Sequence, residues 1–215
     1  MSQSELPPPG RALVLDLVSF VGTAAAAVWF GWETRELVWG LWLSSLLIGY
    51  ATLLLSVGGQ YWFTRELAVK GEITHPAARA VARGVTIIIG LFSAAFFTVH
   101  FGGFHLGHGA FLNTFFPLGP TTDGAFGYLE HLPEAFRIGW PLLLGSLIAS
   151  RDDLRNAPKE TGFAKPYLNV IRMHLLIFVF AFASAARLDQ RWLYLVVLFF
   201  YFFPFREIKR LLTRR

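Results

Sequence analysis

The sequence predicts an all-α integral membrane protein, a polytopic bundle of about six transmembrane helices, and three observations support this prediction. Of the 215 residues, 54% are hydrophobic and only 15% are charged, whereas about a quarter of the residues of a soluble domain are charged. The mean hydropathy is +0.50. The apolar residues also form runs of the length that crosses a bilayer. We therefore treat residues 1–215 as a single membrane domain.

Six apolar segments follow one another, and each is expected to form one transmembrane helix. They are residues 12–29, 37–57, 85–112, 138–149, 167–186 and 192–205. The fourth and sixth are shorter than the roughly 20 residues that cross a bilayer untilted, so their flanking residues are expected to complete them. The third is expected to begin as a helix near Pro76, because Pro is favoured in the first helical turn. Residues 1–10 form a polar tail and residues 206–215 a basic tail.

The distribution of Lys and Arg predicts that both termini are cytoplasmic. If the N-terminus lies inside, fourteen of the 19 basic residues fall in the inner segments, and only Arg35, Arg187 and Arg191 fall in the outer ones. Cytoplasmic loops carry this excess of positive charge. We therefore expect a multi-pass protein of the cell (inner) membrane, with the lipid bilayer as its main partner. Anchoring explains the net charge of +5, so no nucleic-acid partner is expected.

Composition also limits the chemistry. The chain has no cysteine, which excludes disulfides, thiolate metal sites and a cysteine nucleophile. Its 22 Phe and seven Trp make a homo-oligomer plausible, because aromatic side chains are expected on its surface.

The third apolar segment carries three histidines, His100, His105 and His108, among four glycines. Ionisable side chains within a membrane span are costly and are therefore functional candidates. His105 and His108 are three residues apart and share a helix face, so they can chelate one ion. His100 joins them only if the helix bends or unwinds, which the pair Gly102-Gly103 makes inexpensive.

The outer loop, residues 113–135, adds Glu130, His131 and Glu134 on the same side of the membrane. Imidazoles with one or two carboxylates suit Zn, Mn or non-haem Fe. We therefore predict a divalent-metal site facing outside, with Glu134 or Glu130 as the acid–base group of an enzyme. The alternative is that the histidines cap helix ends, pack under aromatic rings or hydrogen-bond across the bundle.

A second polar set lies towards the inside, where Asp16 is in the first span and Arg172 and His174 are in the fifth. A charge within a span is normally paired, so an ion pair between Asp16 and Arg172 is expected. The alternative is a proton or ion path from this set to His100, with Asp16 and Arg172 as a gate. His174 and His100 also offer a bis-histidine haem site, which a depth difference of roughly 10 Å disfavours.

The run His100-Phe101-Gly102-Gly103-Phe104, followed by His108-Gly109-Ala110-Phe111, resembles the signature of a family of small prokaryotic multi-span membrane proteins of unknown function. Arg172-Met173-His174 also resembles that family's fifth span. The resemblance covers the third to fifth spans and implies a site built from His100, His108 and His174. It implies no reaction.

Three functions remain open from the sequence. The first is a metal-dependent membrane enzyme. The second is a transporter or channel for metal ions or protons that uses the same histidines. The third is a structural membrane subunit without a site.

Overall fold

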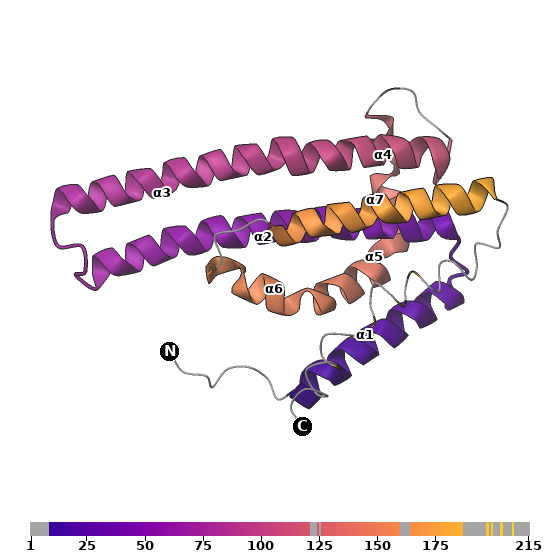
Figure 1. Cartoon of the computed structure of the whole chain (residues 1–215), viewed down its shortest axis with the longest axis horizontal. Coiled ribbons are helices and arrows are strands. Elements are labelled where there is room, and N and C mark those ends of the chain that lie inside the picture. Colours follow the sequence, from indigo (N-terminus) through magenta and orange to yellow (C-terminus); the bar gives the residue numbers. More distant parts are fainter. Residues whose placement is uncertain are drawn as a thin grey trace.

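The computed structural model describes residues 9–120, 124, 126–159 and 164–186, together with Val197, Phe199, Phe203 and Ile208. Within these residues the chain is helical and forms no strand (Figure 1). The α-helices are α1 (Pro9–Trp29), α2 (Thr34–Val69), α3 (Pro76–Phe97), α4 (Gly103–Phe115), α5 (Leu132–Ala149), α6 (Arg151–Asn156) and α7 (Ala164–Ala185). A π-helical turn η1 (Thr98–Gly102) and two 3₁₀ turns, η2 (Gly127–His131) and η3 (Ala157–Lys159), complete the described elements.

Helix α2 is the centre of the bundle and contacts α3, α4, α5, α6 and α7. Small residues on α2 let these neighbours approach closely. Gly40 faces Gly139 of α5, and a Cβ atom at Gly139 would lie 3.0 Å from the Gly40 Cα atom. Gly49 lies under the ring of Phe101, where a Cβ atom would be 2.1 Å from the Cζ atom. Close packing through small residues is typical of helices in membranes.

Helices α3 and α4 form one continuous helix through η1, and this helix runs antiparallel beside α2 (Figure 1). The expected start at Pro76 is confirmed, and the Nδ1 atom of His75 accepts a hydrogen bond from the Ala77 backbone at 3.3 Å. At Gly102-Gly103, where the sequence allows a bend or an unwound segment, the structure has the π-helical turn η1. The helix is wider at this turn, but it continues into α4 without unwinding. Such turns occur frequently at functional sites.

Among the described residues, two helices are long and apolar enough to cross a membrane, namely Thr34–Val69 and Pro76–Phe115. The second is mostly exposed, and its outward face is apolar. Exposed side chains on this face include Val85, Ile88, Leu91, Phe92, Val99 and Phe104. The expected first and fifth spans coincide with α1 and α7, and the fourth lies within α5. The sixth lies outside the described residues except for three positions, of which Phe199 and Phe203 contact Phe20 of α1.

Candidate functional site

Two tryptophans of α2, Trp39 and Trp42, form the centre of a buried cluster near the N-terminal end of this helix. Their rings are 5.6 Å apart in an edge-to-face arrangement, and the side chains are 0% and 1% exposed. The Trp39 Nε1–H donates to the main-chain oxygen of Phe116 at 2.8 Å, and that of Trp42 donates to the oxygen of His105 at 3.0 Å. Both indole N–H groups are therefore satisfied, which makes their burial tolerable.

His105 is buried against this pair, and its ring is held from both sides. The ring centroid lies 4.2 Å from that of Phe101 and 6.1 Å from that of Trp42. Its Nδ1 atom lies 2.9 Å from the Phe101 main-chain oxygen. A carbonyl oxygen only accepts hydrogen bonds, so Nδ1 carries the proton and Nε2 carries the lone pair. Metal-binding histidines are commonly oriented by a bond of this kind.

His108 lies beside His105 on the same helix face, as the spacing of three residues predicts. The two ring centroids are 6.2 Å apart, and both side chains are buried. Tyr128 of η2 closes the cluster, because its ring packs 5.7 Å from Trp42 and directly on Gly109. Burial raises the pKa of Tyr128, so its phenol stays protonated at neutral pH. Sequence reasoning did not include Tyr128 among the site residues. Gly109 is the signal that a bulky side chain covers this position of α4.

His131, also of η2, joins the cluster through the other tryptophan. Its ring centroid lies 6.0 Å from that of Trp39 and the side chain is buried. Its Nε2 atom has no hydrogen-bond partner among the described side chains and backbone. His131 and His105 thus contact different indoles of the pair. No group of three His, Asp or Glu side chains in the described part of the chain is placed to hold one metal ion.

His100 does not join His105 and His108, contrary to the prediction that these residues converge. Its side chain is exposed, its ring stacks on Phe96 at 4.1 Å, and Nδ1 lies 3.1 Å from the Phe96 main-chain oxygen. Two rows of stacked rings spaced four residues apart explain the difference. Phe97, Phe101 and His105 form the row that faces the bundle. Phe92, Phe96 and His100 form the row that faces outward. The bis-histidine haem arrangement needs His100 to face inward. His174 is on α7, and its side chain lies outside the described ones.

The two carboxylates expected to serve as acid–base groups lie at the start of α5 and in η2. Glu130 is exposed. Glu134 accepts two hydrogen bonds from Arg137, at 2.8 and 2.5 Å. These bonds hold the pKa of Glu134 below its usual range, so the carboxylate is a poor proton donor at neutral pH.

Asp16 pairs with Arg151 at the start of α6 and not with Arg172, so the predicted ion pair is wrong. Helix α1 packs along α5, which ends next to Arg151. The Ser19 Oγ–H donates to the Gly145 main-chain oxygen at 3.1 Å along the same contact. Arg172 is exposed on α7. The helical rise per residue placed Asp16 and Arg172 at a similar depth, but it could not show which helices are neighbours.

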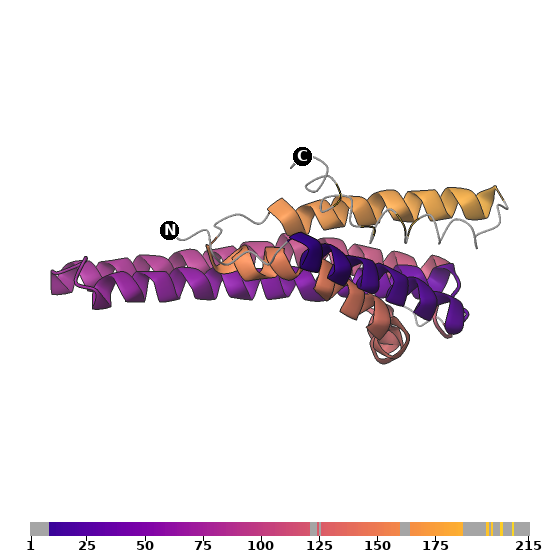
Figure 2. The same cartoon turned by 90° about the horizontal axis from the view of Figure 1, so that it is seen from below.

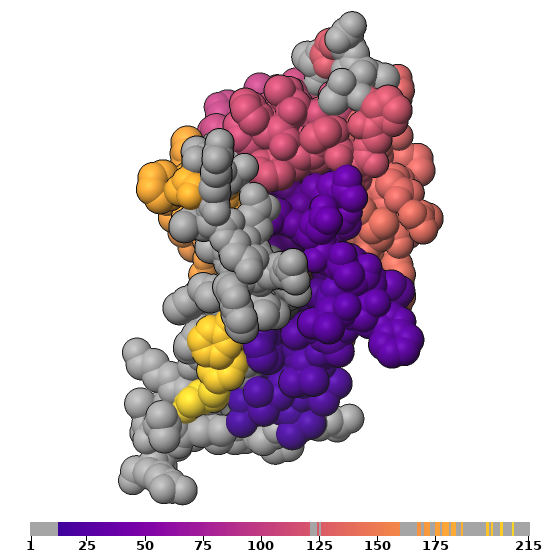
Figure 3. Space-filling model, turned by 90° about the vertical axis from the view of Figure 1, so that its right-hand side faces the viewer, coloured from indigo at the N-terminus to yellow at the C-terminus, as the bar shows by residue number. Residues whose placement is uncertain are grey.

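The fold and the cluster define an all-helical protein with two helices able to cross a membrane and a buried histidine–tryptophan cluster at one end. Figure 3 looks onto this end and shows α2, α4 and α5 packed against one another. Residues 4–202 match the model of a family of unknown function, DUF6498, and the chain belongs to this family. Searches of curated proteins and of solved structures found no match. The prediction of a family of unknown function is thereby confirmed.

Proposed function

We propose that this chain is a multi-pass inner-membrane protein that binds a divalent transition metal through His105 and His108. One observation carries the proposal. Two buried imidazoles share a helix face, and the hydrogen bond from His105 to Phe101 leaves the His105 Nε2 atom as the ligating nitrogen.

The membrane placement is supported by the apolar outward face of α3 and α4. Soluble monomers rarely expose an apolar patch of this extent, and lipid is the environment in which such a face is favourable. The distribution of Lys and Arg supports six crossings with both termini inside. In this orientation the tryptophan pair and the histidines occupy the outer half of the bundle.

The two rings are close enough to share one ion after a small side-chain adjustment. A Zn–N bond is about 2.0–2.1 Å long, so two imidazoles on one tetrahedral ion have centroids about 5.2 Å apart. The observed separation is 6.2 Å, so the rings would approach each other by about 1 Å on binding. Nitrogen donors without a neighbouring carboxylate favour Zn²⁺ or Fe²⁺ over Mn²⁺, which prefers oxygen ligands.

Two protein ligands leave coordination positions open, and open positions are typical of catalytic ions rather than structural ones. The metal would polarise a substrate or activate water in a site that the indoles and Tyr128 shield from solvent. This favours a metal-dependent membrane enzyme. A transporter is the weaker candidate, because Asp16, its proposed gate, is engaged by Arg151.

Metal titration of the purified protein tests the proposal. Chelator-treated protein is titrated with Zn²⁺ and with Co²⁺, and binding is measured by calorimetry and by the visible spectrum of bound Co²⁺. We expect one ion per chain, with affinity lowered at least about tenfold in His105→Gln and His108→Gln. His100→Gln is the matched control, because His100 is on the same helix but exposed, and it should bind normally. An absence of binding, or an equal loss in the control, would contradict the proposal.

A further inference from the structure

The inner end of the α2–α3 hairpin, residues 58–84, extends past the rest of the bundle (Figures 1 and 2). We call this segment the inner arm. Helix α2 has 36 residues and is therefore about 54 Å long, whereas the hydrocarbon core of a bilayer is about 30 Å thick. With the membrane placement proposed above, on which this inference rests, the inner arm emerges from the cytoplasmic side of the bilayer.

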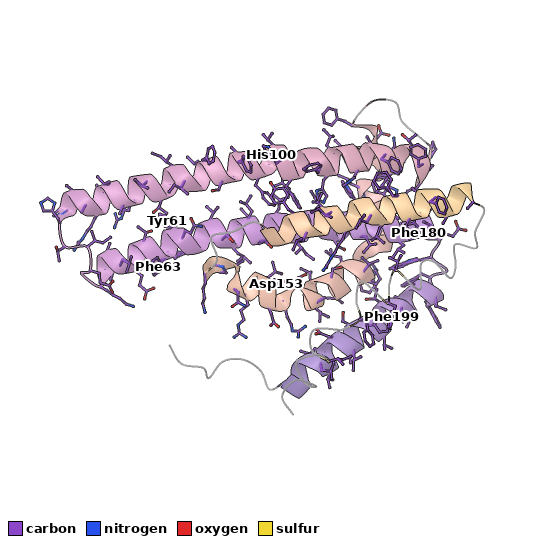
Figure 4. All side chains as sticks on the ribbon, viewed as in Figure 1. Tyr61, Phe63, His100, Asp153, Phe180 and Phe199 are labelled. Carbon is purple, nitrogen blue, oxygen red and sulfur yellow. The ribbon has the colours of Figure 1, made fainter. Side chains whose placement is uncertain are left out.

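An aromatic collar marks the level at which α2 leaves the bilayer. Tyr61, Trp62 and Phe63 are 43%, 59% and 62% exposed. Successive helical residues are 100° apart, so these three side chains point in different directions around α2. Tyr61 and Phe63 are labelled on this helix in Figure 4. Trp and Tyr concentrate at the membrane–water interface, and the collar therefore indicates the height of the lipid headgroups.

Two arginines lie just beyond the collar, and neither has a carboxylate partner in the part of the chain that the structure describes. Arg65 places its guanidinium carbon 4.8 Å from the ring centre of Trp62. Arg83 is exposed on α3. The hydroxyl groups of Thr64 on α2 and Thr86 on α3 lie 3.0 Å apart. Arg65 and Arg83 follow and precede these threonines closely in the sequence, so they lie at a similar height. Neither arginine forms an ion pair with a carboxylate of the described residues.

The other two basic side chains of the inner arm are already engaged. Lys70 pairs with Glu66 at 2.6 Å, and the Arg79 Nε–H donates to the Ile73 main-chain oxygen at 2.6 Å. Only the charge of Lys70 is neutralised by this pairing, whereas the Ile73 oxygen holds the Arg79 side chain towards the tip of the arm. Arg65 and Arg83 are therefore the charged side chains that lie next to the collar without such a contact to the tip. Guanidinium groups bind phosphate oxygens in a bidentate manner.

We propose that Arg65 and Arg83 form a binding site for the phosphate group of an anionic phospholipid in the inner leaflet, with Trp62 holding the Arg65 side chain in place. The aromatic collar selects a lipid over a soluble phosphate compound, because it puts both guanidinium groups at headgroup height. The cytoplasmic leaflet supplies anionic headgroups there.

Thermal unfolding in nanodiscs tests this site. Metal-free protein is reconstituted in phosphatidylcholine discs with and without phosphatidylglycerol, so the outcome does not depend on the metal site. The anionic lipid should raise the unfolding temperature of the wild type, and high salt should reduce this shift. The variant with Arg65→Gln and Arg83→Gln should lose the shift. Arg155→Gln, an exposed arginine on the same side without an aromatic collar, should keep it.

Native mass spectrometry of the same samples gives a second readout that does not depend on the stability of the variants. We expect retained phosphatidylglycerol on the wild type and on Arg155→Gln, and reduced retention on the double variant. Equal shifts and equal retention in the wild type and the double variant would overturn the proposal. It would also be overturned if inorganic phosphate, added to discs of phosphatidylcholine alone, reproduced the stabilisation.

Discussion

The Nδ1 atom of His105 lies 2.9 Å from the main-chain oxygen of Phe101, four residues earlier in the same continuous helix. The π-helical turn ends between these two residues, at Gly102. One contact thus fixes the ring orientation and the tautomer of a buried histidine next to a second histidine.

The first prediction concerns that tautomer. In metal-free protein with ¹⁵N-labelled histidine, His105 should be neutral with its proton on Nδ1, because the Phe101 oxygen only accepts hydrogen bonds. The ¹⁵N chemical shifts of the imidazole distinguish the tautomers, and His105→Gln assigns the signal. A proton on the Nε2 atom of His105 would contradict the proposed ligand geometry.

The second prediction concerns the contact between Gly109 and Tyr128. A Cβ atom at Gly109 would lie 2.7 Å from the Tyr128 ring, so Gly109→Ala should destabilise the protein by about 1–3 kcal/mol through overpacking. Gly107→Ala is the matched control, because a Cβ atom there meets nothing within 4 Å. The control should be neutral or stabilise by about 0.5–1 kcal/mol. Unfolding in detergent measures both, and equal behaviour of the two variants would refute the packing.

The third prediction concerns the ion pair between Asp16 and Arg151. The two side chains are 15% and 24% exposed, so Asp16→Asn leaves a partly desolvated arginine and should cost about 1–3 kcal/mol. A double-mutant cycle with Arg151→Gln should reveal coupling, because contacting residues are non-additive. The cycle of Asp16→Asn with Arg172→Gln should be additive. Coupling to Arg172 instead of Arg151 would restore the pairing that the sequence predicted.

The fourth prediction concerns pH and the pair of Glu134 and Arg137. The pKa of Glu134 is lower in the folded protein than in the unfolded chain, where it is about 4.3. The pair therefore stabilises the fold above that value, and the stabilisation is lost as the pH falls through the folded-state pKa. The Arg137 side chain is 73% exposed and that of Glu134 is 40% exposed, so solvent screens the pair and the effect should be small. The stability difference between the wild type and Glu134→Gln should be present at pH 7 and vanish in acid, and a difference that grows in acid would contradict the pairing.

The sequence predicted the local features of this protein well. Helical periodicity placed His105 and His108 on one face, and the residue pattern at Pro76 located the start of α3. These features depend on neighbouring residues in one helix, whose geometry is known in advance.

The sequence did not predict features that depend on which helices are neighbours. Trp39 and Trp42 are covered by α4 and η2, and their N–H groups donate to main-chain carbonyl oxygens of distant residues. The sequence analysis paired Asp16 with Arg172 because the two lie at a similar depth. In the structure α1 packs along α5, and this places Asp16 beside Arg151. Tyr128 was not predicted to cover α4, because the sequence pattern around an aromatic residue in a loop does not show which helix it packs against.

The most direct test of the central claim is the X-ray absorption spectrum of the zinc-loaded protein at the zinc edge. Ligation by His105 and His108 predicts the outer-shell scattering of two imidazoles in the wild type and in His100→Gln. In His105→Gln or His108→Gln it predicts the scattering of one imidazole, measured at a zinc concentration that keeps the variant loaded. An oxygen-only shell, or a two-imidazole pattern unchanged by both substitutions, would contradict a metal site at this histidine pair.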